Sequence, residues 1–204
     1  MKIIKPSAEL LAITPDCEKL IELAGRTCYK SEDKITDESA PRFIRMIRER
    51  KHYSVIEHAS ATIRFTCDRG VSHEIVRHRT GAYSQESTRY CNYSKDKFGS
   101  EIKLIEPPFQ SDEQAQSWRE AMEAAEAAYL KLLEQGAKAE LARSVLPNSL
   151  ATEIVMTMNF RNWLHFFDLR CSRAAHPQMR EVAFLARDLL AAQAPAIFGD
   201  LDAD

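Results

Sequence analysis

The sequence predicts an α+β fold in which a mainly antiparallel sheet is flanked by helices and carries one long ordered loop. Residues 59–67 alternate between apolar and polar side chains, which is typical of a strand with one buried face. Residues 112–135 repeat apolar side chains at spacings of three and four, which is typical of an amphipathic helix. No linker or internal repeat interrupts the 204 residues, so we expect a single domain over residues 1–204.

The first quarter of the chain is predicted to hold a short strand and two helices. Ile3 and Ile4 open the strand, and residues 16–28 and 37–50 carry apolar side chains at helical spacing. The outer side of the second helix carries a row of arginines, which we interpret as a solvated helix face. These arginines are Arg42, Arg45, Arg48 and Arg50, and the side chains expected to face the core are Leu20, Ile21, Leu23, Ala24, Phe43, Ile44 and Ile47.

The middle of the chain is predicted to contain the clearest strand and a long loop. After the strand at 59–67 we expect a short helix over 70–78 and then an ordered loop over 79–100. Long loops without regular structure are usually functional when they are ordered. The side chains expected on the buried face of the strand are Ala59, Ala61, Ile63, Phe65 and Cys67.

The second half of the chain alternates short strands with long helices. Residues 102–105 form a strand, and Ser111 with Gln114 makes a capping box for a helix that runs to about residue 135. Residues 150–158 are predicted to form another strand and residues 160–172 a helix. We expect about five strands in the whole sheet. Pro177 opens the last helix, whose expected inward side chains are Val182, Leu185, Ala186, Leu189 and Leu190.

Charge and composition exclude several classes of protein. The 28 basic and 30 acidic residues give a net charge of −2, which does not indicate a protein that coats nucleic acid. No apolar run is long enough to cross a membrane and residues 1–6 lack a secretory signal, so we expect no membrane partner and a cytoplasmic location. The five cysteines include no CxxC pair, which predicts neither a disulfide framework nor a metal site.

The densest group of chemistry-bearing side chains lies at residues 77–90. Arg77, His78 and Arg79 are followed by a polar run that contains Arg89 and several hydroxyl groups. Guanidinium groups bind phosphate through two parallel charged hydrogen bonds, and Gln85 is suited to read the amide-like edge of a base. The alternative is a basic surface loop; the spacing favours an anion-binding site.

A second group lies at residues 159–170. On a helix, Arg161 and His165 share one face, whereas Arg170 projects with the apolar side chains. Because a charge on a buried face costs free energy unless it is paired, two interpretations stay open. One is an internal ion pair with a glutamate, and the other is an arginine held in a dry pocket for an anionic ligand. Arg143 is a further candidate anion contact.

Three other patterns have alternative interpretations. Ser54 and Glu57, within the run His52–His58, form either a capping box or a ligand contact. His73 and His78 are one residue too far apart for a zinc-binding HExxH pair, because positions five apart on a helix point about 140° apart. Cys91 is interpreted as a small buried side chain rather than a nucleophile.

The run Arg77-His78-Arg79 followed after seven residues by Ser87 is similar to the RHR-x7-S signature of flavin-dependent thymidylate synthases. The HxSxxEH run at 52–58, Arg143 and the run from Asn159 to Arg170 stand in the order expected of that family. The resemblance covers roughly residues 20–180. It implies formation of dTMP from dUMP without a cysteine nucleophile, with 5,10-methylenetetrahydrofolate as carbon donor, FAD as hydride carrier and NADPH as reductant. It also implies a homotetramer with shared active sites, in which the long loop is an active-site loop.

The resemblance also assigns roles to individual residues. Arg170 matches the arginine that favours ionisation of the uracil ring at N3, because a fixed guanidinium in a pocket of low dielectric stabilises the anion. Glu74 and His165 stand where other members carry Gln and Asn, and Cys28 stands where Ser occurs and is left out of the site. The FAD contacts implied are Ser54, Arg77, His78, Arg79, Gln85, Asn159, Arg161 and His165; the dUMP contacts implied are Glu74, Ile75, Val76, Arg77, Gln85, Glu86, Ser87, Thr88, Arg89, Arg143 and Arg170.

Two other classes of protein remain as alternatives. One is a nucleotide- or RNA-binding module that stacks bases on Tyr83, Tyr90 and Tyr93. The net charge and the arginine among apolar side chains argue against that class. The other is a cysteine- or metal-dependent nucleotide hydrolase, which would be sensitive to chelators and colourless.

Overall fold

The computed structural model describes residues 1–95 and 99–201, which divide into two compact units. Unit 1 consists of Met1–Ser7, Thr66–Arg77 and Ser84–Ile154. Unit 2 consists of Ala8–Phe65, His78–Tyr83 and Val155–Asp204, of which the structure describes the residues up to 201. The expectation that residues 1–204 form one domain stays a prediction.

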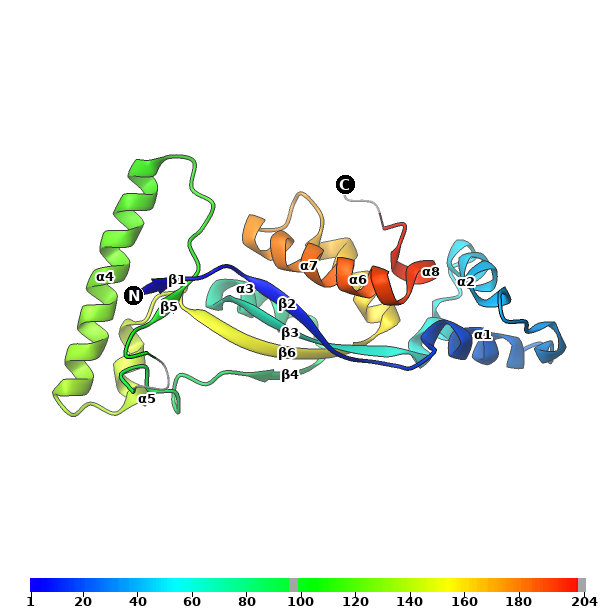
Figure 1. Cartoon of the computed structure of the whole chain (residues 1–204), viewed down its shortest axis with the longest axis horizontal. Coiled ribbons are helices and arrows are strands. Elements are labelled where there is room, and N and C mark those ends of the chain that lie inside the picture. Colours follow the sequence, from blue (N-terminus) through cyan, green and yellow to red (C-terminus); the bar gives the residue numbers. More distant parts are fainter. Residues whose placement is uncertain (96–98, 202–204) are drawn as a thin grey trace. The chain divides into compact units, whose positions relative to one another are not determined.

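The main sheet has four strands in the order β2-β3-β6-β4 and is antiparallel (Figure 1). Neighbouring strand ends meet in opposite directions, since Thr14 N donates to Ser60 O at 3.0 Å and Phe160 N donates to Ala59 O at 2.9 Å. A separate parallel pair joins β1 to β5, with Lys2 opposite Lys103. The strands of the described residues are β1 (Lys2–Ile3), β2 (Ser7–Ile13), β3 (Ser60–Asp68), β4 (Ala82–Gln85), β5 (Lys103–Leu104) and β6 (Ala151–Asn159).

Helices account for most of the remaining regular structure (Figure 1). The α-helices of the described residues are α1 (Cys17–Thr27), α2 (Ser39–Glu49), α3 (Arg69–Ile75), α4 (Asp112–Glu134), α5 (Ala139–Ala142), α6 (Phe160–Arg170), α7 (Pro177–Gln193) and α8 (Pro195–Phe198). Short 3-10 helices are η1 (Glu32–Lys34), η2 (Tyr53–His58) and η4 (Arg143–Val145). Within the described ranges, no helix combines the length and the hydropathy that a bilayer-spanning segment needs.

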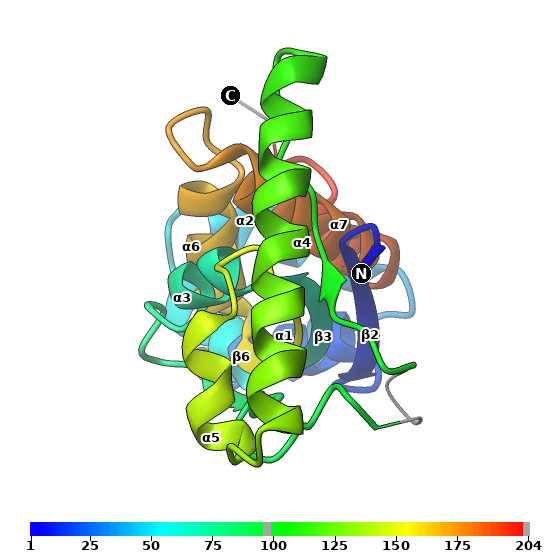
Figure 2. The ribbon, with the colours of Figure 1, turned by 90° about the vertical axis from the view of Figure 1, so that its left-hand side faces the viewer.

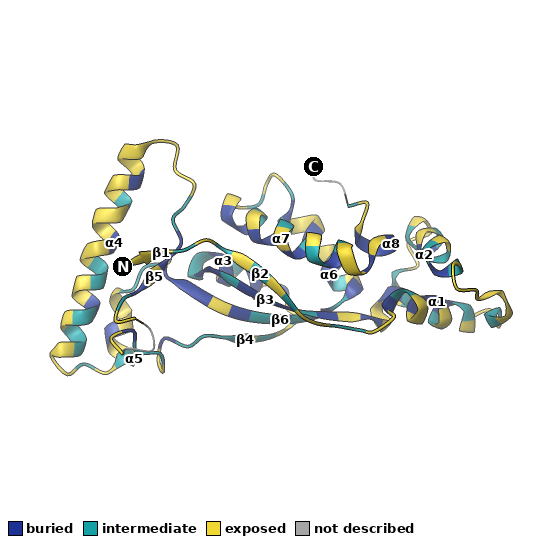
Figure 3. Ribbon diagram, in the orientation of Figure 1, coloured by how far each residue is buried: buried dark blue, intermediate teal, exposed yellow. Residues whose placement is uncertain are grey.

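The core of unit 2 forms where α6 packs on β3. Trp163 donates its indole N–H to Ala61 O at 3.2 Å, and its ring lies 6.4 Å from that of Phe65. Ala59, Ala61, Ile63, Phe65 and Cys67 are all at most 2% exposed, which confirms the predicted buried face (Figure 3). The alternation in the sequence therefore identified the strand and the face on which α6 packs.

The core of unit 1 gathers along one side of α4, which also packs against α5 (Figure 2). Ser111 caps α4 by accepting a hydrogen bond from Gln114 N at 3.3 Å, as the capping box predicts. Tyr129 is buried and its hydroxyl accepts a hydrogen bond from Tyr93 N at 3.2 Å. The other face of α4 is largely exposed (Figure 3).

The α+β class is confirmed, but three details differ from the prediction. The main sheet has four strands rather than five, because β1 and β5 form a separate pair. Strand β2 was not predicted, since none of its residues is fully buried and its sequence lacks a clean alternation. The long loop expected over 79–100 contains β4, and its residues 96–98 lie outside the described residues.

Three leucines that we expected in the core are instead exposed. Leu20, Leu23 and Leu185 are 36%, 47% and 39% exposed. On α1 the buried stripe runs through Cys17, Ile21 and Gly25, and Leu20 and Leu23 lie together on the opposite side of the helix. The helix also buries Glu22, which accepts hydrogen bonds from Arg26 Nε and Ser39 Oγ, both at 2.7 Å.

Candidate functional site

A buried histidine and an arginine lie together in unit 2. His78 is 7% exposed, and its Nε2 accepts a hydrogen bond from Arg170 Nε at 3.0 Å. Its ring packs edge-on against Phe166, with centroids 4.9 Å apart, and its centroid lies 6.0 Å from that of His165. Tyr83 donates its hydroxyl to His78 O at 2.5 Å. Tertiary structure thus joins two predicted site residues that are 92 positions apart.

Burial keeps this histidine neutral. Desolvation, followed by electrostatic interaction with Arg170 and His165, lowers the pKa of His78 from 6.5 to about 4. Neutral imidazole has one nitrogen with a free lone pair, which is what the N–H of Arg170 requires. Because Nε is held, the plane of the Arg170 guanidinium is fixed, and its charge lies half-buried on α6.

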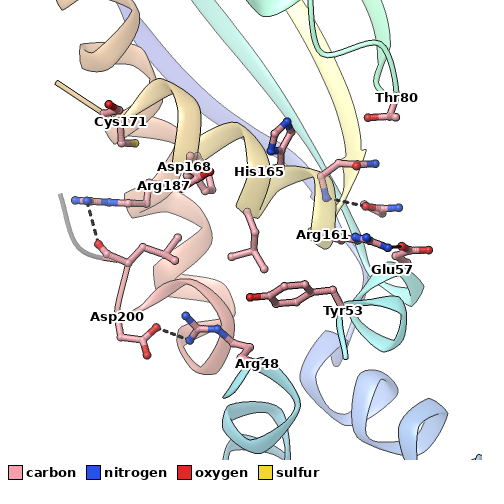
Figure 4. A pocket seen from close by; sticks show the side chains of 16 residues that line it. Arg48, Tyr53, Glu57, Thr80, Arg161, His165, Asp168, Cys171, Arg187 and Asp200 are labelled. Carbon is pink, nitrogen blue, oxygen red and sulfur yellow. Dashed lines mark hydrogen bonds and ion pairs between the residues drawn. The ribbon is translucent and has the colours of Figure 1, made fainter. Parts of the chain in front are cut away.

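The first turn of α6 lines a cavity of about 890 Å³ in unit 2 (Figure 4). Asn159 caps the helix by accepting a hydrogen bond from Asn162 N at 2.9 Å. Arg161 and His165 follow on one face, as the sequence predicts, and both line the cavity. Arg161 Nη1 pairs with Glu57 Oε1 at 2.5 Å, and both side chains are exposed, at 52% and 40%.

Ser54 lines a different cavity of unit 2, of about 1120 Å³. It lies inside η2, whose N-cap is His52, and no side chain caps this helix. The capping box proposed for Ser54 and Glu57 is therefore wrong. A 3-10 helix has three residues per turn, so consecutive side chains diverge by about 120° and Tyr53 and Ser54 line different cavities.

The predicted site residues 74–79 lie at the C-terminal end of α3 and in the segment that follows it. Asp68 caps α3 by accepting a hydrogen bond from Val71 N at 2.7 Å, and the helix ends at Ile75, whose side chain is fully buried. Arg77 of unit 1 and Arg79 of unit 2 are exposed. Neither arginine has an ion pair with any residue that the structure describes.

Gln85 and Glu86 are tied into unit 1 by several hydrogen bonds. Gln85 Nε2 donates to Ser72 Oγ at 2.9 Å and to Thr152 Oγ1 at 3.3 Å. Glu86 N donates to Glu153 O at 2.9 Å, and the Glu86 carboxylate accepts a hydrogen bond from Tyr93 OH at 2.7 Å. These bonds hold the segment that follows β4 in one conformation.

The end of that segment meets Arg143. Thr88 is 6% exposed, and its hydroxyl accepts a hydrogen bond from Arg143 Nη1 at 3.3 Å. Arg89 N donates to Ser87 Oγ at 3.4 Å, and the Arg89 guanidinium lies 5.1 Å from the centre of the Tyr90 ring. The structure thus brings Arg143 and Thr88 into contact in unit 1, whereas the Arg89 guanidinium lies over the exposed Tyr90 ring.

Sequence reasoning missed several residues beside the predicted ones. Arg69 donates Nη2 to Glu86 O at 3.0 Å and buries an Nε that has no hydrogen-bond partner among residues 1–95 and 99–201. Arg48 was interpreted as part of a solvated face, which is wrong, because its side chain is 17% exposed and lines the cavity beside α6. Arg187 also lines that cavity, and no spacing in the sequence marked it. The signal that the sequence offers for these residues is its excess of arginine, with 17 arginines against 11 lysines.

Three of the cysteines are held as buried thiols. Burial raises the pKa of Cys67 to about 12 and that of Cys171 to about 11, and it also raises the pKa of Cys17. A thiol of this kind carries almost no thiolate at neutral pH. Cys91 is half-buried and Cys28 is exposed.

Comparisons with known proteins agree on one family. The family model described as "Thymidylate synthase complementing protein" (Thy1) matches residues 9–196. A flavin-dependent thymidylate synthase of Geobacter sulfurreducens is 38% identical over 198 residues, which cover 94% of this chain and 84% of that protein. The protein of the same name from Mycobacteroides abscessus is 37% identical over 203 residues, covering 90% and 79% of the two chains.

One solved structure is similar over almost the whole chain. It is the UMP/dUMP methylase PolB of Streptomyces cacaoi, solved with 5-Br dUMP bound. The TM-score is 0.80 and the identity is 26%, and the match covers 98% of this chain and 96% of that chain.

Proposed function

This chain belongs to the thymidylate synthase complementing protein family, and on that premise we propose how its residues carry the family's reaction. It is a flavin-dependent thymidylate synthase that methylates dUMP to dTMP and uses FAD as its cofactor. The observation that carries the proposal is the hydrogen bond from Arg170 to a buried, neutral His78.

The residues present fit FAD. Arg77 and Arg79 are exposed guanidinium groups without an ion pair in the described part of the chain, which suits the pyrophosphate. The cavity beside α6 has the volume of a small-molecule site and is lined by the side chains of Asn159, Arg161 and His165. When bound, FAD supplies the hydride of the reaction. The residues that we propose to hold FAD are Ser54, Arg77, His78, Arg79, Gln85, Asn159, Arg161 and His165.

Arg170 is the proposed catalytic residue. A guanidinium beside the uracil ring stabilises negative charge at N3 and so lowers the pKa of that nitrogen. His78 holds Arg170 Nε, and Tyr83 in turn holds the backbone of His78, so the cation is oriented before substrate arrives. Preorganised charge of this kind acts without reorganisation during the reaction.

The remaining dUMP contacts are proposed for the two cations and their neighbours in unit 1. Arg143 and Arg89 carry the charge that a nucleotide phosphate needs, and Ser87 and Thr88 add hydroxyl groups. The contact between Arg143 and Thr88 supports the assignment of both to one ligand. The full proposed set is Glu74, Ile75, Val76, Arg77, Gln85, Glu86, Ser87, Thr88, Arg89, Arg143 and Arg170.

We propose that no cysteine acts as a nucleophile. The raised pKa values of Cys17, Cys67 and Cys171 support this proposal, since a thiolate is needed for attack on the pyrimidine. Activation of the ring by Arg170 then takes the place of covalent activation.

The finer parts of the reaction are proposals from the resemblance. They are 5,10-methylenetetrahydrofolate as carbon donor, NADPH as reductant, a homotetramer with shared active sites and a cytoplasmic location. The five free cysteines favour a reducing compartment.

The test combines a spectrum with turnover. FAD and then dUMP are added to the purified protein, and the visible flavin spectrum is expected to shift with dUMP. Arg170→Ala is expected to bind FAD and to lose about 100- to 1000-fold in dTMP formation, as with removal of a preorganised donor. Arg173→Ala, which removes an exposed arginine just beyond α6, is the matched control and is expected to retain activity. A protein that takes up no FAD, or an Arg170→Ala variant with normal turnover, would refute the proposal.

A further inference from the structure

The cavity beside α6 extends beyond the residues proposed for FAD. Figure 4 shows Arg161 and Glu57 on one side, and Arg48, Arg187 and Asp200 on the other. None of the last three belongs to the proposed FAD or dUMP contacts. They come from α2, α7 and the segment after α8, so only the tertiary structure of unit 2 brings them to one wall.

Both arginines on this wall are largely buried, and Arg48 is incompletely satisfied. Arg48 is 17% exposed and uses a single nitrogen, Nη1, for its ion pair with Asp200 and its hydrogen bond to Ala196 O at 3.2 Å. Its Nε and Nη2 have no partner among the described residues. Arg187 is 21% exposed; its Nε and Nη2 donate to Asp188 Oδ1 at 3.2 and 3.0 Å, and its Nη1 donates weakly to Leu201 O at 3.4 Å. Its carboxylate partner Asp188 is itself 67% exposed.

The carboxylate that pairs with Arg48 is held loosely. Asp200 lies just after α8, and its side chain is 64% exposed. Ion pairs with such an exposed partner contribute little to stability, so a competing anion can displace the carboxylate. A phosphate or a second carboxylate offers the same acceptor geometry to a guanidinium fork.

We propose that Arg48 and Arg187 form a subsite for the anionic end of a long co-substrate, with Asp200 as its displaceable counter-ion. The inference rests on the proposed function, because it concerns the co-substrates of that reaction. Two sources carry suitable anions: the phosphate that distinguishes NADPH from NADH, and the carboxylates of a folate. The pyrophosphate of FAD and the phosphate of dUMP are assigned to other arginines, so their affinities should not depend on this wall.

The test uses the FAD-loaded enzyme and steady-state kinetics. Arg48→Gln and Arg187→Gln are each expected to raise the KM of one co-substrate about tenfold, the effect of losing roughly 1.4 kcal/mol of binding. Asp200→Asn is expected to lower the same KM severalfold, because it removes the competing carboxylate. If the anion is the phosphate of the reductant, the KM of NADPH changes and that of NADH does not. If the anion is a folate carboxylate, the KM of the folate changes. The effect of the substitutions on that KM is then expected to be larger for folates that carry additional glutamates.

Arg45→Gln is the matched control, since Arg45 lies on the same helix one turn earlier and lines the other cavity. It is expected to leave both KM values unchanged.

The alternative is that the Asp200 carboxylate only stabilises the fold through its ion pair with Arg48. The Asp200→Asn variant would then be less stable but would have unchanged KM values, which would overturn the inference. Shifts in FAD or dUMP affinity would also overturn it. If Arg48→Gln fails to fold, Asp200→Asn and Arg187→Gln decide the question. Failure of the proposed function would appear separately, as a wild-type chain without flavin uptake or dTMP formation.

Discussion

Replacement of His78 by phenylalanine tests whether the imidazole positions Arg170. Phenylalanine retains an aromatic ring against Phe166 but offers no acceptor to Arg170 Nε. A hydrogen bond to a charged group contributes about 1.5–3 kcal/mol, and this contribution is available only while the guanidinium is held in place. If the whole of it is lost in the transition state, turnover falls about 10- to 150-fold.

The assay is the rate of dTMP formation at saturating FAD and dUMP, with FAD binding followed by its visible spectrum. His78→Gln is the conservative variant, because an amide oxygen can accept the same hydrogen bond, and it is expected to recover part of the rate. A double-mutant cycle with Arg170→Ala separates positioning from a direct role. If His78 acts through Arg170, His78→Phe has little further effect in the Arg170→Ala background. An equal loss in both backgrounds, or a normal rate in His78→Phe alone, would refute the reasoning.

Three further predictions concern pH, cysteine chemistry and the core. Because the pKa of His78 falls from 6.5 to about 4 on folding, the unfolded chain binds more protons between these pH values, and the unfolding free energy decreases as pH falls through this window. The full shift corresponds to at most about 3.4 kcal/mol, reduced by residual hydration to about 1–2 kcal/mol, and urea unfolding of His78→Phe should lack this slope. Replacement of all five cysteines by alanine or serine is expected to retain dTMP formation if the fold survives; complete loss with intact FAD and dUMP binding would indicate a cysteine mechanism. Ile63→Ala in β3 is expected to lower the unfolding free energy by about 2–5 kcal/mol, whereas Glu123→Ala on the exposed face of α4 should change it by less than about 0.5 kcal/mol; similar losses in both would contradict the core assignment.

Local patterns in the sequence were sufficient for most elements of the fold. The alternation over 59–67 predicted β3 and its buried face, and Ser111 with Gln114 predicted the start of α4. These features depend on residues within a few positions of one another, so they can be predicted from a single sequence. Strand β2 was missed because it carries no buried face of its own, and its place beside β3 is set by backbone hydrogen bonds.

In the candidate site, too, some features follow from the sequence and others only from the tertiary structure. The sequence by itself determined the residue types and their spacing, and so the resemblance to one family, which the comparisons confirm. It could not show that Arg170 reaches His78, that Arg161 pairs with Glu57, or that Arg143 reaches Thr88. Each of these contacts joins residues that are 55 or more positions apart, and no local periodicity relates such positions.

Arg48 shows the same limit on the scale of one helix. Its spacing from Arg45 and Arg42 predicted a solvated face, and its backbone does lie on α2 as expected. Only packing against the segment that follows α7 turns its guanidinium toward Ala196 O and Asp200. Whether an arginine is a solubilising charge or part of a binding wall depends on what covers its helix, and that is decided by tertiary structure alone.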